Sequence, residues 1–120
     1  LVLSGVFNKF PNLKIIIGHL GETLPFLMWR IDLALNRPGN DGIAFREIFT
    51  SNFYITTSGF FSDPALLCCI QEMGVDRILF AIDYPFVPNE PGPKWMEQLM
   101  LNREDKAKIL HGNAERILNI

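Results

Sequence analysis

Three short apolar runs recur along the chain, and each is followed by a helical pattern of apolar and polar positions. Residues 13–18 contain three consecutive isoleucines, residues 53–57 are aromatic and β-branched, and residues 77–82 are again mostly apolar. A continuous apolar run of this length is typical of a parallel strand that is covered on both faces. We therefore expect three strands at these positions, the first of them with both faces buried.

The first helix is expected at about residues 23–37, ending near an Arg-Pro-Gly stop. Thr23 can cap it and Pro25 is tolerated in its first turn. Its apolar face is predicted from helical spacing and consists of Phe26, Leu27, Ile31 and Leu35. Residues 40–52 are expected to hold a short helical segment around positions 45–49.

The later segments carry clear start and stop signals. Asp63 and Pro64 are expected to begin a helix as N-cap and first-turn proline, and Gly74 ends it. Asn102 is expected to cap a helix that runs to about residue 111, Gly112 to stop it, and Asn113 to cap a last helix at 114–118. Between these helices, four prolines predict an irregular loop placed like a lid over a strand end: Pro85, Pro88, Pro91 and Pro93.

Strands that alternate with helices imply right-handed crossovers and a parallel sheet. An open doubly wound sheet would need a glycine-rich phosphate turn, which the sequence GHLGE at residues 18–22 does not match. The predicted fold is therefore α/β, about three βα units of a TIM (β/α)8 barrel. A closed barrel takes about 250 residues. We expect residues 1–120 to be a single partial domain, the C-terminal half of a barrel whose N-terminal strands are absent.

Composition limits the partners and the compartment. The chain is 48% hydrophobic with a net charge of -2 and no run of Lys or Arg, which argues against binding to nucleic acid or to an anionic membrane. It has neither a membrane-length apolar stretch nor a signal-peptide pattern, so a cytoplasmic location is expected. Cys68 and Cys69 are adjacent on an expected helix, which suits buried thiols in a reducing compartment better than a disulfide or a zinc site.

Two candidate site residues stand where a predicted strand stops. His19 follows the first strand and Asp83 follows the third. In a barrel, the C-terminal ends of the strands surround one mouth, so the two side chains could meet there as a base and a metal ligand. A lone histidine beside apolar residues is also compatible with a satisfied core histidine. An aspartate after an apolar run is costly to bury without a cation or donors, which favours a site role; the alternative is that Asp83 caps or hydrogen-bonds the loop that follows.

Other residues have weaker signals. Glu22 lies three residues after His19, where its carboxylate could bond the imidazole, but it could also be a first-turn helix acid. Arg30 lies about two turns further along and is compatible with a surface or interhelix salt bridge. His111 is expected to be structural, at a helix end. Aromatic side chains near the mouth could line a pocket for an aromatic substrate: Phe60, Phe86 and Trp95.

Four segments in this order resemble the C-terminal half of the amidohydrolase-related decarboxylases, which include the aminocarboxymuconate semialdehyde, γ-resorcylate and dihydroxybenzoate decarboxylases. They are FPNLKIIIGHLGE at 10–22, WRID at 29–32, IDYPF at 82–86 and GNAERIL at 112–118. The resemblance implies that His19 is an active-site histidine, Glu22 its carboxylate partner, Asp83 a metal-binding aspartate and Arg30 a substrate-binding arginine. The family's N-terminal Glu-x-His or His-x-His pair and one further histidine have no counterpart here.

The resemblance further implies a metal-dependent, nonoxidative decarboxylase acting on a hydroxylated aromatic or related unsaturated carboxylic acid. The expected cofactor is a divalent metal, zinc or alternatively manganese, and the expected partners are the small acid and further copies of the protein in a dimer or tetramer. Asp83 would be both ligand and proton carrier, assisted by His19 and Glu22. Two alternatives stay open: a metal-dependent amidohydrolase-type hydrolase on the same scaffold, and a noncatalytic truncated chain.

Overall fold

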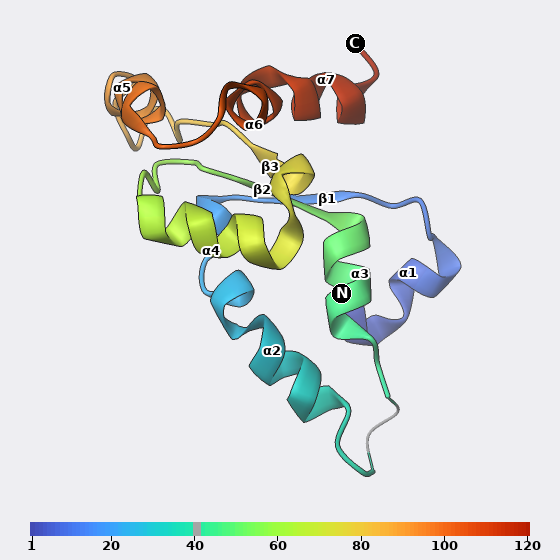
Figure 1. Cartoon of the computed structure of the whole chain (residues 1–120). Coiled ribbons are helices and arrows are strands. Elements are labelled where there is room, and N and C mark those ends of the chain that lie inside the picture. Colours follow the sequence, from blue (N-terminus) through green and yellow to red (C-terminus); the bar gives the residue numbers. More distant parts are fainter. Residues whose placement is uncertain (40–41) are drawn as a thin grey trace.

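The computed structural model describes residues 1–39 and 42–120 of the chain. Strands and helices alternate along most of the sequence (Figure 1). The strands are β1 (Ile15–Ile17), β2 (Phe53–Thr56) and β3 (Ile78–Leu79). The α-helices are α1 (Val6–Lys9), α2 (Leu24–Leu35), α3 (Phe45–Asn52), α4 (Asp63–Met73), α5 (Pro91–Gln98), α6 (Arg103–Ala107) and α7 (Asn113–Leu118). Short 3-10 turns occupy Val2–Ser4, His19–Gly21 and Val75–Arg77, and a π-helical turn spans Lys108–Gly112.

The three strands form one parallel sheet in the order β1-β2-β3, as the sequence predicts. Ile16 stands opposite Tyr54, and Ile55 stands opposite Ile78. All three strands run toward the left of Figure 1, so their carboxyl ends lie at one edge of the sheet. The architecture is that of an open part of a (β/α)8 barrel, and it brings the residues after β1, β2 and β3 together.

One face of the sheet carries the core. Phe53 and Ile55 on β2 are buried in a cluster with Phe49 of α3 and Met28 of α2. On the opposite face, Ile16 is 49% exposed, so the expectation that the first strand is buried on both faces is wrong for the described residues. Side chains on that face of a barrel strand point into the interior.

Strand β3 is shorter than the predicted residues 77–82 because its hydrogen bonds change partner after Leu79. The N–H of Phe80 donates to the carbonyl of Ile109. The N–H of Ala81 donates to Oγ1 of Thr57 at 2.9 Å, and the same hydroxyl donates to the carbonyl of Ala81 at 2.6 Å. The Thr57 side chain therefore takes the place of a neighbouring backbone at this point and positions the segment that leads to Asp83.

Replacing Thr57 with valine should lower the stability of the protein that contains this chain. Thr57 is completely buried. Valine keeps the shape but leaves the N–H and C=O of Ala81 without that partner, and each unpaired buried group costs about 1–3 kcal/mol. We expect the free energy of unfolding to fall by about 2–4 kcal/mol in a denaturant titration. Thr57→Ser retains the hydroxyl, so its free energy of unfolding should fall less. Equal losses of stability in the two variants would contradict the role given to the hydrogen bonds of Thr57.

Helix α2 faces the core differently from the sequence prediction. The buried residues are Pro25 and Met28. Phe26, expected on the apolar face, is 79% exposed, whereas Leu27, Ile31 and Leu35 are half-buried. Met28, two positions after Phe26, is buried in its place, so the buried face of the helix is rotated and Phe26 lies outside it. Thr23 occupies the N-cap position, but its side chain makes no capping hydrogen bond.

The irregular proline-rich loop is shorter than expected. Helix α5 begins at Pro91, so Pro91 and Pro93 belong to its first turn, where the missing N–H costs nothing. The irregular part is residues 84–90. Asp63 also differs from its prediction: Ser62 holds the N-cap position of α4, and the Asp63 carboxylate instead accepts a hydrogen bond from Nε1 of Trp95 at 2.7 Å. Gly74 ends α4, as predicted.

The last helices are continuous where the sequence predicts a break. Asn102 caps α6, accepting a bond from the N–H of Asp105 as expected. Gly112, however, has helical φ and ψ and lies inside the π-helical turn that joins α6 to α7. Asn113 does not cap a helix. It is fully buried and donates to the carbonyls of Val75 and Ile78, so the side chain ties α7 to the start of β3.

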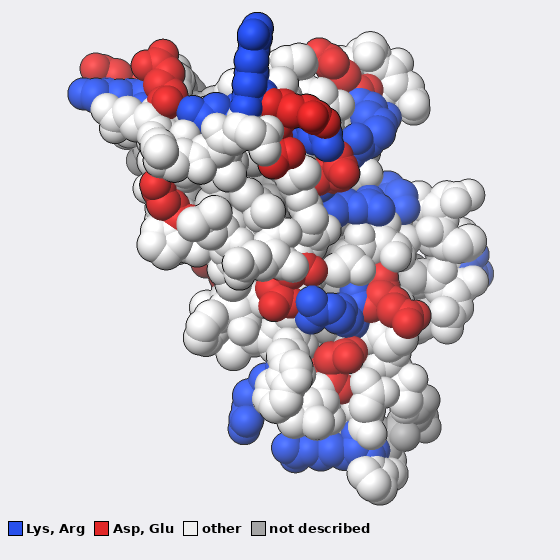
Figure 2. All heavy atoms as spheres, viewed as in Figure 1, with Lys and Arg blue, Asp and Glu red and all other residues white. Residues whose placement is uncertain are grey.

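Charged side chains of both signs are interspersed on the face shown in Figure 2, without a broad patch of one sign. That distribution agrees with the small net charge of -2. Within residues 1–39 and 42–120, no helix has the length and apolar character needed to cross a bilayer.

Candidate active site

His19 is positioned by a tight turn directly after β1. The carbonyl of Gly18 accepts a bond from the N–H of Gly21, and the carbonyl of His19 accepts one from the N–H of Glu22, both at 2.9 Å. His19, Leu20 and Glu22 all have positive φ, an uncommon conformation for residues other than glycine. The turn folds the chain back on itself, so that Glu22 returns beside the imidazole.

Asp83 follows β3 and also has a positive φ, of 78°. Its carbonyl accepts hydrogen bonds from the N–H groups of Phe86 and Val87, which close the next turn. Gly59 allows the turn after β2 to approach this segment, because a Cβ there would lie 3.4 Å from Cβ of Asp83 and only 2.7 Å from Cγ2 of Val87. The backbone therefore positions Asp83, and its carboxylate is not used to cap the loop.

The structure brings His19, Glu22 and Asp83 together. Nε2 of His19 lies 3.3 Å from Oδ2 of Asp83, and Nδ1 lies 3.2 Å from Oε1 of Glu22. The imidazole thus has a carboxylate at each ring nitrogen. The side chain of Asp83 is the least exposed of the three, at 30%, against 47% for His19 and 69% for Glu22. Such an arrangement can hold and pass a proton, because one nitrogen can donate while the other is oriented by its own partner.

Arg30 does not join this group. It lies exposed on α2 and contacts none of the other three candidates within the described part of the chain. The salt bridge considered for it from the sequence is also missing among those residues. His111 lies beside Gly112, and Nδ1 of its ring is 3.0 Å from Oε1 of Glu115 on the next helix, an exposed pair; the helix end at which His111 was expected is absent from this described segment, because a π-helical turn continues into α7.

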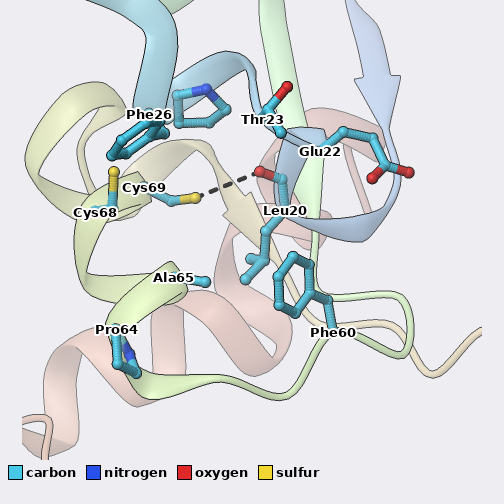
Figure 3. A pocket seen from close by; sticks show the side chains of 10 residues that line it. Leu20, Glu22, Thr23, Phe26, Phe60, Pro64, Ala65, Cys68 and Cys69 are labelled. Carbon is cyan, nitrogen blue, oxygen red and sulfur yellow. Dashed lines mark hydrogen bonds between the residues drawn. The ribbon is translucent and has the colours of Figure 1, made fainter.

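An apolar cavity of about 610 Å³ adjoins the group on the side of Glu22 (Figure 3). It lies between the start of α2 and helix α4, and Phe60 is the one of the three expected aromatic residues that lines it. Trp95 packs against Phe61 instead, and Phe86 is exposed. The carboxylate of Glu22 points away from the side of the cavity formed by Phe26 and Cys68. Since neither His19 nor Asp83 lines the cavity, it lies beside the place where these two meet.

The two cysteines, predicted as buried thiols, are free and line this cavity; Cys69 is buried, whereas Cys68 is only partly buried. The thiol of Cys69 is buried and donates to the carbonyl of Leu20 at 3.4 Å. Burial, reinforced by the neighbouring Cys68, raises the pKa of Cys69 to about 12. Burial and the nearby Glu72 carboxylate also raise the pKa of Cys68, which is less enclosed.

Cys69 should therefore resist alkylation. With a pKa of about 12, only about one thiol in ten thousand is ionised at pH 8, and the thiolate is the reactive form. We expect iodoacetamide to label Cys69 at least about 100-fold more slowly than an exposed thiol, with Cys68 between the two. Peptide mass spectrometry over a time course measures both rates, and a Cys68→Ser variant isolates Cys69. Equal labelling of the two cysteines would contradict the enclosed environment described above.

Residues 1–39 and 42–120 do not form a complete metal site by themselves. Among the described residues, no group of three or more His, Cys, Asp or Glu side chains is arranged to hold a metal ion. Asp83 can offer one carboxylate ligand, but its nearest candidate partner, His19, faces it through a hydrogen bond. Catalytic zinc sites usually take three protein ligands.

A pair of hydroxyl groups at the end of β2 was not predicted from the sequence. Oγ1 of Thr56 and Oγ of Ser58 are hydrogen-bonded to each other. Both stand beside Gly18, between the segments that carry His19 and Asp83. The sequence signal was present, because residues two apart at a strand end share one face of the sheet.

Comparison with known proteins identifies the family. Residues 1–120 match the protein family described as Amidohydrolase. The γ-resorcylate decarboxylase of Polaromonas sp. (strain JS666 / ATCC BAA-500) is 41% identical over 127 residues, which cover 100% of this chain and 38% of that protein. The chain thus spans about two fifths of the length of this relative.

Solved structures of similar proteins support the same family assignment. A 2,6-dihydroxybenzoate decarboxylase in complex with 2,6-dihydroxybenzoate superposes with a TM-score of 0.90 at 39% identity, over 98% of this chain and 38% of the other. A dihydroxybenzoic acid decarboxylase from Polaromonas sp. JS666 has been solved with bound manganese and the inhibitor 2-nitroresorcinol. It superposes with a TM-score of 0.89 at 42% identity, over 97% of this chain and 36% of the other. The chain belongs to the amidohydrolase family, within which these similar proteins are decarboxylases.

Proposed function

We propose that the protein containing this chain is a metal-dependent, nonoxidative decarboxylase of a hydroxylated aromatic or related unsaturated carboxylic acid. The observation that carries the proposal is the contact between His19 and Asp83 at the carboxyl ends of β1 and β3, with Glu22 on the other ring nitrogen. The similarity to γ-resorcylate and dihydroxybenzoate decarboxylases supports the choice of reaction.

The proposed chemistry moves one proton. Asp83 donates a proton to the ring carbon that bears the carboxylate; the carbon–carbon bond then breaks, its electron pair returns to the ring and carbon dioxide leaves. Asp83 has then lost a proton. His19 resupplies it through the contact between Nε2 and Oδ2, which measures 3.3 Å, while Glu22 holds the imidazole at Nδ1. Proton transfer from a positioned side chain contributes about 10²- to 10⁴-fold to such rates.

We further propose that Asp83 is one ligand of a divalent cation, and that its other ligands come from residues outside this chain. Zinc is the ion expected from the sequence, whereas a similar protein holds manganese. When bound, such an ion offsets the negative charge of the acid and orients it. Arg30 stays a candidate for binding the carboxylate of the substrate, since a guanidinium suits that group.

We place residues 1–120 in the C-terminal part of a barrel domain whose other strands pair with the free edges of β1 and β3, which pair with β2 alone in the described part of the chain. Homo-oligomers and a cytoplasmic location stay predictions from the sequence.

A direct assay tests the proposed reaction. The longest form of the polypeptide that carries these residues is supplied in turn with zinc and with manganese and is incubated with 2,6-dihydroxybenzoate. We expect carbon dioxide and benzene-1,3-diol to form in equal amounts, measured by headspace analysis and liquid chromatography. Water consumption without carbon dioxide, on amide or ester substrates, would favour the hydrolase instead. No turnover with either metal, in protein that binds the metal and is folded, would favour a noncatalytic chain.

A further inference from the structure

We propose that the hydroxyls of Thr56 and Ser58 form a subsite that binds a ring hydroxyl of the aromatic ligand. This inference deepens the proposed function and rests on it for the class of ligand. The subsite lies at the end of β2, whose neighbours β1 and β3 are followed within four residues by His19 and Asp83.

The position of the pair is fixed by its neighbours on both sides. A Cβ built on Gly18 would lie 3.7 Å from Oγ of Ser58 and 3.9 Å from Oγ1 of Thr56. On the other side, a Cβ on Gly59, the residue after Ser58, would lie 3.4 Å from Cβ of Asp83. The two hydroxyls therefore stand between the residue that precedes His19 and the backbone that carries Asp83.

The pair faces the interior side of the sheet. Ile55, between β1 and β3, is buried in the core cluster against the helices. Successive strand residues alternate in direction, so the neighbouring Thr56 points to the opposite face, the one on which Ile16 is exposed. Gly18, just after β1, has no side chain that would cover the hydroxyls, and both Thr56 and Ser58 are partly exposed.

The hydroxyl pair has hydrogen-bonding capacity left over that a ligand could use. Each hydroxyl has one donor hydrogen, and the pair shares a single hydrogen bond. In the described residues, neither hydroxyl has another hydrogen-bond partner. Whichever oxygen donates within the pair, the other keeps a free O–H, and lone pairs remain to accept. The pair can therefore donate one bond and accept another.

The charges around the mouth favour a neutral polar group at this point. Glu22 and Asp83 place two carboxylates around His19. The hydroxyl pair brings no positive charge that would attract an anion. A ring hydroxyl both donates and accepts, as the pair does, whereas a carboxylate only accepts. The subsite should thus distinguish aromatic acids and their analogues by a ring hydroxyl.

Two probes that differ by one hydroxyl test the subsite without requiring turnover. The protein, in its longest form and loaded with manganese, is titrated by calorimetry with 2-nitroresorcinol and with 2-nitrophenol. We expect the wild-type protein to bind the first at least about 10-fold more tightly, since a site built around a hydroxyl discriminates against a ligand that lacks it. In the double variant Thr56→Val and Ser58→Ala, the ratio of the two dissociation constants should fall about 10-fold.

Gly18→Ala gives a second test that keeps both hydroxyls. Gly18 has φ −72° and ψ 179°, which alanine adopts freely, and the added methyl would stand at ordinary contact distance from the pair. The added methyl should cover the hydroxyls and so reduce the ratio of the dissociation constants of 2-nitrophenol and 2-nitroresorcinol. Thr50→Val is the matched control: it removes a hydroxyl bonded to the carbonyl of Arg46 on α3, before the start of β2, and should leave the ratio unchanged.

The outcomes separate this inference from the proposed reaction. Equal affinities for the two probes in the wild-type protein, or no binding of either probe, would overturn the subsite. So would a double variant in which the ratio of the two dissociation constants is preserved, because both probes then lose affinity equally or not at all. Absence of carbon dioxide release from 2,6-dihydroxybenzoate, with the ratio lost in both variants as expected, would overturn the proposed reaction and leave the subsite supported.

Discussion

Replacing Asp83 with asparagine should reduce kcat for decarboxylation by about 10³-fold, which lies within the range for loss of a general acid or base. Asparagine has nearly the same shape, but it cannot carry the proton that the ring carbon needs. The backbone should tolerate the change, because Asp83 has a φ of 78° and asparagine is among the residues most often found at positive φ. The measurement is carbon dioxide release at saturating 2,6-dihydroxybenzoate.

Asp76→Asn is the matched control for this prediction. Asp76 lies just before β3, at the opposite end of the strand from Asp83, where it pairs with Lys108 and Arg116. These exposed ion pairs contribute little, so the variant should keep kcat within about 2-fold. Full activity in Asp83→Asn would show that another group delivers the proton, whereas an equal loss in both variants would indicate a general effect on folding.

The meeting of His19 and Asp83 at one edge of the sheet could be predicted from topology, because parallel strands of one sheet place their carboxyl ends at the same edge and only β2 separates β1 from β3. The positive-φ turns that complete the contact could not. The contact of Glu22 followed from its spacing, although it is a positive-φ turn, rather than a first helical turn, that brings the carboxylate back to the imidazole. Arg30 shows the limit of this reasoning, since its direction depends on the rotation of α2 and no pattern in the chain fixes that rotation.

The three strands and most helices were predictable from apolar runs and stop signals, whereas several local features were not. Trp95 competes for the carboxylate of Asp63, which therefore does not cap α4. Asn113 was mistaken for a cap because the carbonyls it satisfies, those of Val75 and Ile78, are remote in sequence. In each case a tertiary hydrogen bond takes a side chain that local rules assign to a helix end, and single-sequence patterns carry no information about such partners.

The largest loss of stability should come from the aromatic stack between α3 and β2. Phe49 is 1% exposed and lies between Phe45 and Phe53, with ring centroids 5.5 and 4.7 Å away. Phe49→Ala removes the ring from the middle of the stack and leaves a cavity that the neighbouring rings can fill only in part. Substitutions of this kind cost about 3–5 kcal/mol. The free energy of unfolding from a denaturant titration, followed by circular dichroism, measures the loss.

A graded variant shows whether the loss comes from the cavity. Leucine retains much of the volume of phenylalanine, so Phe49→Leu should cost less than about 2 kcal/mol. Equal losses for the two variants would indicate that the stacking of the rings, rather than the filled volume, holds α3 against β2. Because β2 ends at the Thr56 and Ser58 hydroxyls, loosening this stack should also weaken the preference for 2-nitroresorcinol. Phe49→Leu should retain more of that preference than Phe49→Ala, since the core under the strand largely determines where its carboxyl end lies.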